Sequence, residues 1–328
     1  KNYEKIKVGE RMKVAFHTLG CKVNSYESQA MLNMFEEAGY EEVDFKEVAD
    51  VYVVNTCVVT NTGDSKSRQM IRKAIRKNPQ ATVCVVGCYS QVAPQDIEAI
   101  EGVSIILGTQ FRNEIVDLVE KYQQTHERIV KVSEVKQLRK FEDLNIDRFL
   151  HTRAYLKIQD GCNNFCSYCI VPYVRGRERS RSPQDIINEV QELAKKGYKE
   201  ITLLGQNVNS YLVSEKRKNK DLEYTVKIND KGLKINSFAT LLIACNEIKG
   251  IERIRFVSPH PKDFTDDVIE AIAKCDKVCK LVHLPLQSGS TRMLKIMNRK
   301  YTKEQYLNLV EKMKEKIPNV RFSTDIIV

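Results

Sequence analysis

Apolar residues in the first third of the chain form short continuous runs, separated by longer segments with helical spacing. The runs Val51–Val54 and Val83–Val86 are typical of strands that are buried on both faces. The pattern predicts strands at 12–17, 51–55, 82–87 and 103–107, and helices at 25–38, 62–77, 94–100 and 112–122. Because strands and helices alternate, we expect an α/β domain with a doubly wound parallel sheet over residues 12–122.

The same alternation returns in the second half of the chain, from residue 153 onward. It predicts strands at 154–159, 200–205, 252–257, 279–285 and 320–327, and helices at 183–196, 237–248, 264–274, 290–297 and 302–316. We interpret this order as a β/α barrel. The lysine-rich residues 213–236 interrupt it, and we expect an inserted loop or a small hairpin there.

Two segments fit neither pattern. Residues 123–152 are polar and charged without a clear period, which predicts a linker between the two domains. Residues 1–11 precede the first predicted strand and are expected to be an extension. With 328 residues and 42% hydrophobic content, the chain is long enough and apolar enough for two domains with sizeable cores.

The sequence shows no signal for secretion or for a membrane anchor. No apolar run approaches the roughly 20 residues that span a bilayer, and the charged amino terminus has no apolar signal core. The chain contains ten cysteines. Without a secretory signal, this number favours a reducing, cytoplasmic location and thiols that bind metal rather than form disulfides.

Three cysteines follow the first strand predicted for the second domain. Cys162, Cys166 and Cys169 have the spacing Cys-x3-Cys-x2-Cys within AYLKIQDGCNNFCSYCIVPYVRGRERSR. A 4Fe–4S cluster that is held by three cysteines keeps one iron open to another ligand. A zinc knuckle is the alternative, but it requires a fourth Cys or His at short spacing, and no His lies between Cys162 and Cys169. We therefore predict a 4Fe–4S cluster with an open iron.

A second set of three cysteines is spread over the first domain. Cys21, Cys57 and Cys88 each follow a predicted strand and precede a segment with helical character. Ligands gather at the carboxyl ends of strands in an open α/β sheet, so these cysteines are expected to converge although they are far apart in the sequence. Cys84 lies inside an apolar run and is expected to pack in the core, which is also the alternative for the other three.

The two cysteine sets belong to longer motifs that extend over nearly the whole chain, from Met12 to Val328. These motifs are TLGCKVN, NTC, GCYSQ, DGCNNFCSYCIVPYVRGRE, LLGQNVNSY and HLPLQSGSTRMLKIMNRKY. With them the chain resembles the methylthiotransferases of the radical S-adenosylmethionine (SAM) superfamily. Within that family, TLGCKVNSYES, VVTNTGDSKSRQMIRKAIRKNP and LKIQDGC are most similar to the tRNA threonylcarbamoyladenosine methylthiotransferases. The isopentenyladenosine enzymes usually read CQMN at the first cysteine, and the ribosomal-protein branch reads CPKN.

The resemblance implies two 4Fe–4S clusters and SAM as cofactors, and a low-potential electron donor such as flavodoxin or ferredoxin. It implies that a reduced cluster cleaves SAM to a carbon radical, and that the second cluster supplies sulfur, which another SAM molecule methylates. The target is C2 of adenine, whose unactivated hydrogen acid–base catalysis cannot usefully remove. The catalytic cluster is then expected on Cys162, Cys166 and Cys169, and the auxiliary cluster on Cys21, Cys57 and Cys88.

Five further residues are candidates for cofactor binding. Tyr168 matches the aromatic position that the family places near the SAM adenine. Gln206, Asn207, Ser258 and Gln287 are predicted at the carboxyl ends of barrel strands, where barrel active sites gather. The alternative for each of these four is a side chain that caps a strand or a turn.

The net charge of +10 indicates a nucleic-acid partner. Arg68, Arg72 and Arg76 recur every four residues, so they are expected on one face of a helix. A solvated charged surface is the alternative for such a set. Because the resemblance is to a tRNA-modifying family, we expect these arginines to contact RNA.

A second set of arginines directly follows the cysteine loop of the second domain. Arg175, Arg177, Arg179 and Arg181 alternate along the sequence, so an extended chain would point all four the same way. We expect this set also to contact RNA, with the same alternative of a solvated surface.

The resemblance implies the anticodon stem-loop of tRNA as substrate, with a methylthio group added to C2 of N6-threonylcarbamoyladenosine at position 37. The alternatives are methylthiolation of isopentenyladenosine-37, methylthiolation of a ribosomal protein, and an iron–sulfur electron-transfer or RNA-binding module without catalysis. Three-cysteine sites argue against a pure electron carrier, which usually has four ligands per cluster. The second domain has five predicted strands where the radical SAM core has six. We therefore expect a chain truncated before the last strand and an RNA-binding domain.

Overall fold

The computed structural model describes residues 11–58, 61–144, 146, 153–228 and 231–328, and it divides into two compact units. The first unit comprises Lys1–Leu138 and Glu142–Arg148, and the second comprises Arg139–Phe141 and Phe149–Val328. The extension predicted at 1–11 lies outside the described residues except for Arg11. Among the described residues, no helix is both long and apolar enough to cross a membrane.

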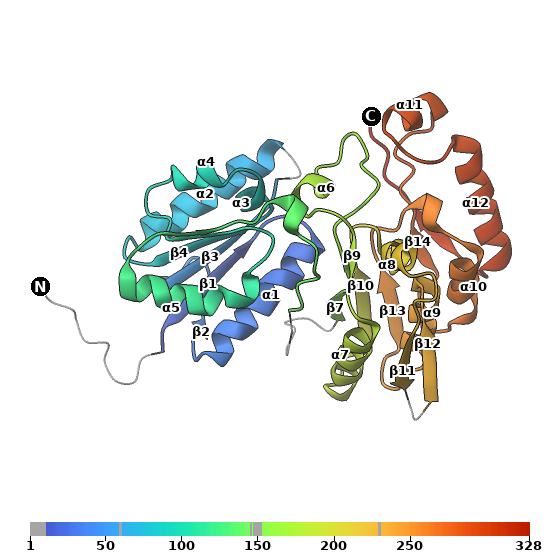
Figure 1. The fold of residues 1–328 in the computed structure, drawn as a ribbon, viewed down its shortest axis with the longest axis horizontal. Helices are drawn as coiled ribbons and strands as arrows, with labels where there is room; N and C mark the ends of the chain where they lie inside the picture. The colour runs from blue at the N-terminus through green and yellow to red at the C-terminus, as the bar shows by residue number, and fades with distance from the viewer. Residues whose placement is uncertain (1–10, 59–60, 145, 147–152, 229–230) are drawn as a thin grey trace, which may run out of the picture. The chain divides into compact units, whose positions relative to one another are not determined.

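The first unit is built on one parallel sheet, which confirms the doubly wound α/β prediction (Figure 1). Its strands are β1 (Lys13–Thr18), β2 (Glu41–Glu42), β3 (Val51–Thr56), β4 (Thr82–Gly87), β5 (Ile105–Leu107) and β6 (Ile129–Lys131). The order β2-β1-β3-β4-β5-β6 changes direction between β1 and β3. Open sheets of this kind bind ligands at such a switch point, outside the carboxyl ends of the strands.

Helices cover both faces of this sheet, so its central strands are buried on both sides (Figure 1). Side chains alternate along β3: Val53 packs with Phe35 in one core cluster, and Val54 packs with Ile71 in the other. One face carries α1 (Lys22–Glu37) and α5 (Ile115–Thr125), and the other carries α2 (Asn61–Lys77), α3 (Cys88–Val92) and α4 (Pro94–Glu98).

The first unit extends further along the chain than the sequence pattern indicates. Helix α5 continues to Thr125, and β6 adds a strand within residues 123–152, which are predicted as a linker. Both β6 and the two-residue β2 are too short to show a period of their own, and neither continues a predicted apolar run as the three-residue β5 (Ile105–Leu107) does. Residues 145 and 147–152 of the predicted linker lie outside the described residues.

The second unit contains the partial β/α barrel that the sequence predicts. Strands β7 (Arg153–Lys157), β10 (Glu200–Leu204) and β13 (Arg253–Phe256) form one parallel sheet, and β14 (Leu281–His283) pairs in parallel with β15 (Arg321–Ser323). A parallel bridge between Ile254 and Val278 joins the two groups. The accompanying helices are α7 (Pro183–Lys195), α9 (Phe238–Asn246), α10 (Asp266–Lys274), α11 (Thr291–Ile296) and α12 (Lys303–Lys316).

Local structure departs from the prediction around the cysteine loop and the lysine-rich insertion. The strand predicted at 154–159 ends early, and a two-residue strand β8 (Gln159–Asp160) pairs antiparallel with β9 (Arg179–Ser180). A short helix, α6 (Val171–Val174), lies between β8 and β9. The insertion contains α8 (Val213–Lys218) and the hairpin of β11 (Tyr224–Ile228) and β12 (Lys231–Ile235), which confirms the expected hairpin.

A buried ion-pair network completes the core of the first unit. Arg112 is fully buried; its Nη2 lies 3.2 Å from Glu27 Oε2 in α1, and its Nη1 pairs with Glu142. Nearby, the Tyr26 hydroxyl donates a hydrogen bond to the Leu144 carbonyl oxygen at 2.8 Å. These contacts fix the segment around Glu142 against α1.

Replacing Arg112 with Met should lower the free energy of unfolding of the first unit by about 3–5 kcal/mol, because two buried carboxylates lose their cation. Urea unfolding followed by circular dichroism measures the effect. In the double variant Arg112→Met/Glu27→Gln, one of the stranded charges is gone, and part of the loss should be recovered. A cost of Arg112→Met below about 1 kcal/mol would mean that the network behaves like a surface pair.

Candidate functional site

The loop that carries Cys162, Cys166 and Cys169 begins with a sharp turn after β8. At Gly161 φ is +76°, and an added Cβ atom would lie 2.6 Å from the carbonyl oxygen of Gly176, so only glycine fits. The Cys162 N–H donates to the same carbonyl oxygen at 3.1 Å. Further along, the Cys169 N–H donates to the Cys166 carbonyl oxygen at 2.9 Å. The backbone thereby folds the three cysteines into one compact loop.

A single buried carboxylate holds the base of this loop. Asp160 Oδ1 lies 3.2 Å from Arg175 Nη1 and accepts a hydrogen bond from the Gly161 N–H at 3.0 Å. Its Oδ2 lies 3.3 Å from Lys157 Nζ and 3.4 Å from Arg179 Nη2. Because a buried charge is stable only when it is paired, this group ties the segments before and after the cysteines together.

The end of α11 fixes the other side of the loop. Asn298 Nδ2 donates to the carbonyl oxygens of Phe165 (2.7 Å) and Asn164 (3.2 Å), and the Ser167 N–H donates to the Met297 carbonyl oxygen at 3.1 Å. Phe165 and Asn298 have φ values of +49° and +56°, which persist in non-glycine residues only where the surroundings hold them. The motif MNRKY therefore positions the cysteine loop.

The three thiols lie close together and mostly away from solvent. Cys162 and Cys166 are each 7% exposed, and Cys169 is half-buried. Burial raises the pKa of the Cys162 thiol to about 11, the neighbouring Cys169 and Cys166 add to the rise, and the backbone of Asn164 opposes it. Buried thiols whose charges would repel one another release their protons when a cationic metal group binds them.

Two side-chain N–H groups approach the sulfur atoms. Asn164 Nδ2 lies 3.5 Å from Cys162 Sγ, and Arg299 Nη1 lies 3.4 Å from Cys166 Sγ. Among the described residues, no group of three or more His, Cys, Asp or Glu side chains surrounds a single metal ion. The thiolates of a 4Fe–4S cube each bind a different iron, so they need not meet at one point. The two N–H donors are suited to the sulfur ligands of such a cluster.

The second set of cysteines lies where the sheet of the first unit changes direction. Strands β1, β3 and β4 are neighbours, so Cys21, Cys57 and Cys88, which follow them, lie at the same edge. A Cβ atom added to Gly20 would lie 2.9 Å from Cys57 Sγ, so the Cys57 thiol packs against the residue that precedes Cys21. Cys57 and Cys88 are buried and Cys21 is exposed. The arrangement fits a three-thiolate site that is open on one side.

Cys84 occupies a different environment from these three residues. It lies in the middle of β4 and packs, fully buried, in the same core cluster as Val53 and Phe35. Burial raises the pKa of its thiol. Its position inside the strand keeps it away from the carboxyl edge, as expected of a packing cysteine.

Three of the predicted cofactor-binding residues lie near the cysteine loop or on the loop that follows β10. Tyr168 is 46% exposed, and its hydroxyl oxygen lies 3.4 Å from Arg299 Nη1. Both polar atoms of the Gln206 side chain are buried without a hydrogen-bond partner among the described residues. Asn207 Nδ2 donates to Asp263 Oδ2 at 2.8 Å, but its Oδ1 has no such partner there. Buried polar atoms of this kind indicate a place for a ligand.

For the other two predicted residues, Ser258 and Gln287, the structure gives backbone hydrogen bonds, and their role in cofactor binding stays a prediction. Ser258 is exposed with φ of +59°, and its carbonyl oxygen accepts a hydrogen bond from the Val208 N–H at 3.2 Å. Gln287 has φ of +72°, and its N–H donates to the Asp325 carbonyl oxygen at 2.9 Å. These positions match the turn role that the sequence allowed as the alternative.

His260, which the sequence did not single out, adds a further polar atom to this region. The Lys262 N–H donates to His260 Nδ1 at 3.2 Å, so the neutral ring carries its proton on Nε2. Within the described part of the chain this Nε2–H has no partner. Burial, together with the positive charges of Arg299 and Lys262, lowers the pKa of His260 to about 2, which keeps the ring neutral.

A polar cavity of ≈ 130 Å³ lies beside the cysteine loop. It contains side chains of both charges and amide groups from the loop itself and from the ends of barrel strands. Among the residues that line it are Asn164, Glu178, Asn207, Asp263, Arg217 and Lys300. The cavity is therefore suited to a small ligand that carries both a positive and a negative group.

Glu178 is the titratable residue of this cavity that sequence reasoning missed. Burial raises the pKa of its carboxyl group to about 7, and Glu215 and Asp263 add to the rise, although Ser210 opposes it. Its place in the RGRE motif was visible in the sequence, but its burial was not. The raised pKa makes it a carboxyl group that exchanges a proton near neutral pH.

Ser210 can form a hydrogen bond with Glu178 in either protonation state. Ser210 Oγ lies 2.7 Å from Glu178 Oε2 and 2.8 Å from the Asn207 carbonyl oxygen. One hydroxyl proton cannot serve two acceptors. If Glu178 carries a proton, it donates to Ser210 Oγ, and the Ser210 hydroxyl donates to the Asn207 carbonyl oxygen. If Glu178 is ionised, the Ser210 hydroxyl donates to it, and the Asn207 carbonyl oxygen keeps the hydrogen bond from the Ser210 N–H at 3.0 Å.

The prediction that Arg175, Arg177, Arg179 and Arg181 share one exposed face is wrong. Arg175 and Arg179 are buried on Asp160, and Arg181 is buried against an acidic residue of α7. The extended segment is only the two residues of β9, and helix α6 precedes it, so the alternation does not hold over the run. Three of the four arginines therefore form ion pairs inside the unit. Only Arg177 is exposed.

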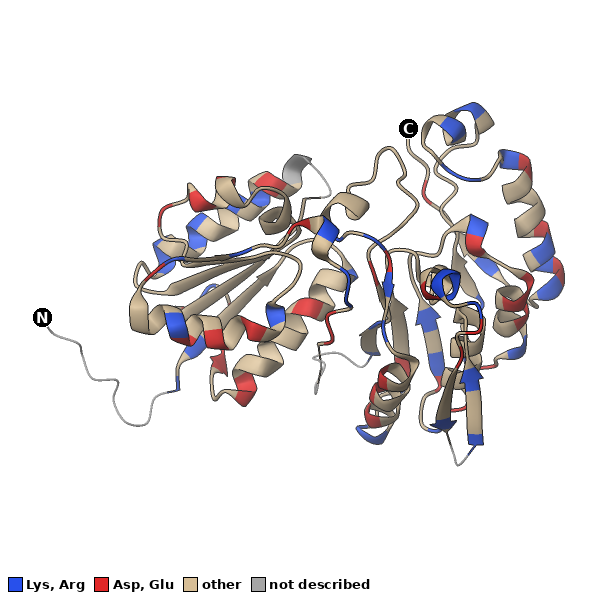
Figure 2. Ribbon diagram, in the orientation of Figure 1, with Lys and Arg blue, Asp and Glu red and all other residues tan. Residues whose placement is uncertain are grey.

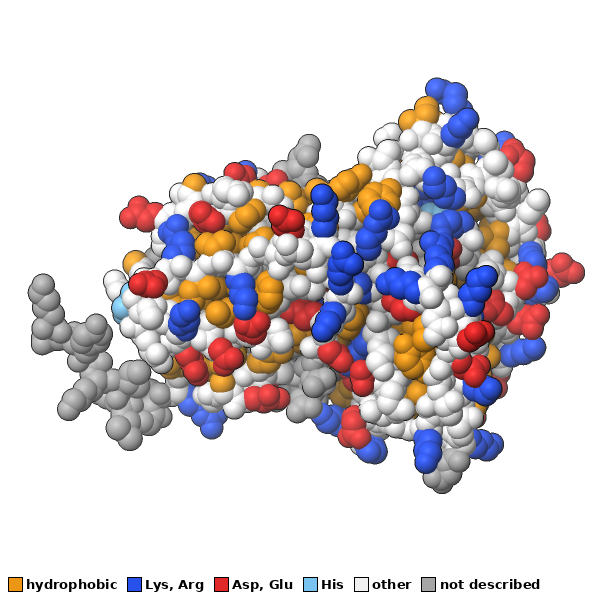
Figure 3. Space-filling model, in the orientation of Figure 1, with side chains coloured by type: hydrophobic (Ala, Val, Ile, Leu, Met, Phe, Trp, Pro, Cys, Tyr) orange, Lys and Arg blue, Asp and Glu red, His pale blue; other side chains and the backbone are white. Residues whose placement is uncertain are grey.

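Several basic side chains nevertheless reach the surface. Arg177 stacks on the Phe165 ring at 4.3 Å, and α8 ends in Lys216, Arg217 and Lys218. Figure 3 shows Lys and Arg side chains gathered on the visible face of the second unit. These cations stand on the unit that also carries the cysteine loop.

The first arginine set lies on helix α2, as predicted (Figure 2). Arg72 and Arg76 are exposed. Arg68 is half-buried, donates to the Tyr89 hydroxyl at 2.8 Å and lies over the Tyr89 ring at 5.8 Å. Arg72 and Arg76 are thus available to an anionic partner, whereas Arg68 is partly used within the unit.

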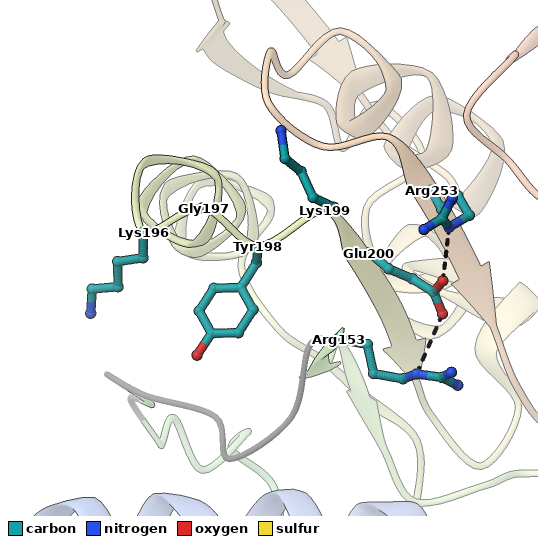
Figure 4. A pocket seen from close by; sticks show the side chains of 7 residues that line it. All are labelled: Arg153, Lys196, Gly197, Tyr198, Lys199, Glu200 and Arg253. Atoms are coloured by element: carbon teal, nitrogen blue, oxygen red, sulfur yellow. Dashed lines mark hydrogen bonds and ion pairs between the residues drawn. The ribbon is translucent and has the colours of Figure 1, made fainter.

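A larger hollow of ≈ 480 Å³ lies at the opposite end of the barrel strands (Figure 4). Arg153, Glu200 and Arg253 are the first residues of β7, β10 and β13, and both arginines pair with Glu200. Burial alone would raise the pKa of Glu200, but the arginines hold it below its usual value. Because barrel chemistry takes place at the carboxyl ends of strands, this hollow is not the candidate active site.

Family models match both units of the chain. The model described as "Uncharacterized protein family UPF0004" matches residues 13–108, and the model of the radical SAM superfamily matches residues 156–328. The first range contains Cys21, Cys57 and Cys88, and the second contains the Cys162 loop.

Curated relatives are similar over nearly the whole chain. The threonylcarbamoyladenosine tRNA methylthiotransferase MtaB of Bacillus subtilis (strain 168) is 45% identical over 317 residues, which cover 96% of this chain and 66% of the relative. The tRNA-2-methylthio-N(6)-dimethylallyladenosine synthase of Clostridium tetani (strain Massachusetts / E88) is 46% identical, with 95% and 66% covered. A synthase of the same description from Clostridium perfringens (strain SM101 / Type A) is 44% identical, with 95% and 67% covered. The chain thus spans about two thirds of the length of these relatives.

Solved structures share the fold at much lower sequence identity. The radical SAM methyltransferase TsrM from Kitasatospora setae, with cobalamin and a 4Fe–4S cluster bound, superposes with a TM-score of 0.60 at 14% identity, covering 97% of this chain and 69% of that chain. The cobalamin-dependent radical enzyme OxsB, with aqua-cobalamin and SAM bound, gives 0.58 at 12% identity, covering 97% and 49%. At such identities the likeness supports the fold alone.

Replacing Glu178 with Gln should remove a pH dependence of stability in the second unit. The folded-state pKa of about 7 lies above the ordinary value of 4.5, so the folded state keeps a proton that the unfolded state loses. The resulting stabilisation is complete below about pH 4.5 and is lost as the pH rises through about 7. Between about pH 5 and pH 8, the free energy of unfolding of the wild type should therefore fall by up to roughly 3 kcal/mol more than that of the variant.

Urea unfolding of both proteins at the two pH values provides the measurement. Glutamine has nearly the same size as glutamate and stays neutral, so the comparison isolates the proton. If the free energies of unfolding of the two proteins changed equally between the two pH values, the prediction of a raised Glu178 pKa would be wrong.

Proposed function

Because the chain belongs to the methylthiotransferase family of radical SAM enzymes, we propose that the protein attaches a methylthio group to C2 of an adenosine beside the anticodon of tRNA. The observation that carries this proposal is the presence of two three-cysteine sites, one in each unit. A cluster with three protein ligands keeps an iron open. One open iron is needed for SAM and the other for the sulfur that is transferred.

The family uses two 4Fe–4S clusters and SAM as cofactors. When bound, these groups supply the electron, the carbon radical, the sulfur and the methyl group of the reaction. The fit of each cysteine set to a cluster supports the following assignment. The SAM-cleaving cluster is held by Cys162, Cys166 and Cys169, and the auxiliary cluster is held by Cys21, Cys57 and Cys88.

The cavity beside the Cys162 loop is proposed to hold the methionyl part of SAM. Its lining includes acidic and basic side chains, such as Glu178, Arg217 and Lys300, which suit the charged methionyl part, whose amino and carboxylate groups the open iron would hold. The unpaired amide atoms of Gln206 and Asn207 offer hydrogen bonds to the nucleoside part. Tyr168, with its exposed ring, provides a stacking surface for adenine.

The protein also contributes to the site by burying two of the loop cysteines and by keeping Glu178 and His260 neutral. Cys162 and Cys166 are nearly inaccessible to water, which protects a reactive radical from side reactions. Glu178 holds a proton near neutral pH, and neutral His260 offers its Nε2–H as a donor. Both residues can thus donate hydrogen bonds without adding charge to the site.

We propose threonylcarbamoyladenosine at position 37 as the modified base. The residues around Cys21, TLGCKVNSYES, support this choice. The B. subtilis relative carries the name of this modification, whereas the Clostridium relatives of similar identity carry the name of the dimethylallyladenosine modification. Overall identity therefore does not discriminate, and the choice depends on the residues at the first cysteine.

Exposed arginines are the proposed RNA contacts. Arg72 and Arg76 are suited to phosphates, which Arg binds in a bidentate manner. Arg177 is exposed and lies over Phe165 of the cysteine loop, so it is the proposed partner of the loop phosphates or of the threonyl carboxylate. Adenosine 37 belongs to a single-stranded loop, from which a base can turn outward to be recognised.

Anaerobic reconstitution should give about eight irons per chain, since each cluster contains four. Replacing Cys162, Cys166 and Cys169 with Ala should leave roughly half of the iron and abolish reductive SAM cleavage. Iron analysis and chromatography of 5′-deoxyadenosine measure the two effects. Reduced flavodoxin or ferredoxin should support the cleavage in wild-type protein in place of a chemical reductant.

Cys84 and Cys88 provide a matched pair of controls. Cys88→Ala should lose the auxiliary cluster, whereas Cys84→Ala should keep all of the iron and lower the free energy of unfolding by about 1 kcal/mol. If the Cys162/Cys166/Cys169 triple variant still cleaved SAM, the assignment of SAM cleavage to this set would be wrong. If Cys84→Ala lost a cluster and Cys88→Ala did not, the assignment of Cys88 as a ligand would be wrong.

The substrate is tested with the whole protein, since the curated relatives are longer than this chain. Purified enzyme, SAM and reductant are incubated with tRNA that carries threonylcarbamoyladenosine, isopentenyladenosine or plain adenosine at position 37, and nucleosides are analysed by mass spectrometry. The methylthio product should form on the threonylcarbamoyl substrate. Neutralising Arg72 and Arg76 should weaken binding of every tRNA and reduce its salt dependence by about one unit per phosphate contact.

Arg175, which is buried, serves as the control for the exposed residues Arg72 and Arg76 in the tRNA-binding measurement. Its replacement by Gln should destabilise the second unit, because Arg175 is buried on Asp160, without changing the salt dependence of the folded fraction. Equal product on the isopentenyl substrate would assign the other tRNA specificity. Modification of a ribosomal protein, with no product on any tRNA, would overturn the proposed function.

A further inference from the structure

Arg299 is a buried cation next to one of the loop cysteines. It is 8% exposed, and its Nη1 lies 3.4 Å from Cys166 Sγ and 3.4 Å from the Tyr168 hydroxyl oxygen. Its Nε donates to the Tyr301 hydroxyl at 3.0 Å, and its Nη2 donates to the Pro285 carbonyl oxygen at 3.3 Å. The guanidinium group is thus fixed on three sides with one N–H directed at a sulfur atom.

No carboxylate in the described part of the chain pairs with Arg299; its contacts are hydroxyl groups, a carbonyl oxygen, an aromatic ring and the Cys166 sulfur. An arginine keeps its charge in proteins, and a buried charge needs a compensating one. The buried residues Arg112, Arg175, Arg179 and Arg181, in contrast, each have a carboxylate partner. For Arg299 the compensating negative charge would come from the Cys166 sulfur when it binds the cluster.

We propose that Arg299 sets the reduction potential of the cluster held by Cys162, Cys166 and Cys169, by donating a charge-assisted hydrogen bond to the Cys166 sulfur. This inference rests on the proposed function, which assigns a 4Fe–4S cluster to that loop. Hydrogen bonds to the cysteine sulfurs and local charge are the means by which a protein tunes such a potential. Arg299 is a positioning and tuning residue, because it acts through Cys166.

The sign of the effect follows from the charge change on reduction. Reduction transfers one electron from an external low-potential donor, such as dithionite, to the cluster; the donor is oxidised, and no bond in the protein forms or breaks. The reduced cluster carries one more negative charge, so a fixed cation beside it favours the reduced state. Arg299 therefore raises the reduction potential of this cluster. The cluster then accepts more readily the electron that SAM cleavage consumes.

The test measures the potentials of both clusters in one protein. Reconstituted wild type, Arg299→Gln, Arg299→Lys and the control Arg292→Gln are titrated with dithionite and followed by electron paramagnetic resonance. Arg292 is an exposed cation on α11, in the same part of the sequence. The cluster that changes its signal when SAM is added is the one in the second unit, and the auxiliary cluster is an internal standard.

In Arg299→Gln the ratio of reduced to oxidised cluster at a fixed potential should fall about tenfold, a shift of 59 mV for one electron. The signal of the auxiliary cluster should not move in any variant. The potential of this cluster in Arg299→Lys, which keeps the charge, should lie closer to the wild-type value than that in Arg299→Gln. The potential in Arg292→Gln should equal the wild-type value. Equal potentials in wild type and Arg299→Gln, or equal shifts in the Gln and Lys variants, would overturn the proposal.

A measurement on wild-type protein keeps the proposal testable if the Arg299 variants do not fold. In protein labelled with 15N-arginine, pulsed electron paramagnetic resonance of the SAM-binding cluster should detect a coupled 15N nucleus, as expected for an N–H bonded to a ligand sulfur. Absence of this coupling would overturn the proposal. If the protein binds no cluster that responds to SAM, the proposed function itself fails, which is a separate result from a SAM-responsive cluster without the 15N coupling.

Discussion

The candidate site depends on the electrostatic pairing of Asp160. This one carboxylate lies among Lys157, Arg175 and Arg179, and its neighbour Gly161 starts the cysteine loop. A buried carboxylate without these cations would be costly, and the cations without it would be equally so. The pairing brings the segment before the loop and the segment after it to one point. The loop that lies between them then has little freedom, and its three thiols are presented together.

The order of the elements could be predicted from the sequence, because apolar runs such as Val83–Val86 and the helical spacing of residues 183–196 give long, clear periods. The same reasoning placed Cys21, Cys57 and Cys88 at strand ends, and parallel pairing brings strand ends to one edge. The short elements β2, β6, β8, β9 and α6 were missed, because they are too short to show a period of their own and do not belong to a run that the pattern predicts.

The sequence was least informative about which polar side chains are buried. Arg175 and Arg179 looked like a surface stripe, because alternation alone cannot show that Asp160 lies beside them. Glu178 and Arg299 were part of quoted motifs, yet their importance comes from burial and from partners far away in the sequence. Such contacts depend on tertiary structure, which a local pattern does not contain.

The clamp that Asn298 and Met297 form on the cysteine loop bears on how the two sites mature during synthesis. All three cysteines of the first unit have been synthesised by residue 88, together with the strands that precede them. The loop of the second unit has its own cysteines by residue 169, but its hydrogen bonds to Asn298 and Met297 form more than a hundred residues later. The first three-cysteine set is therefore complete in the chain before the second unit is made. The second set takes its final shape only after residues 297 and 298 have been synthesised.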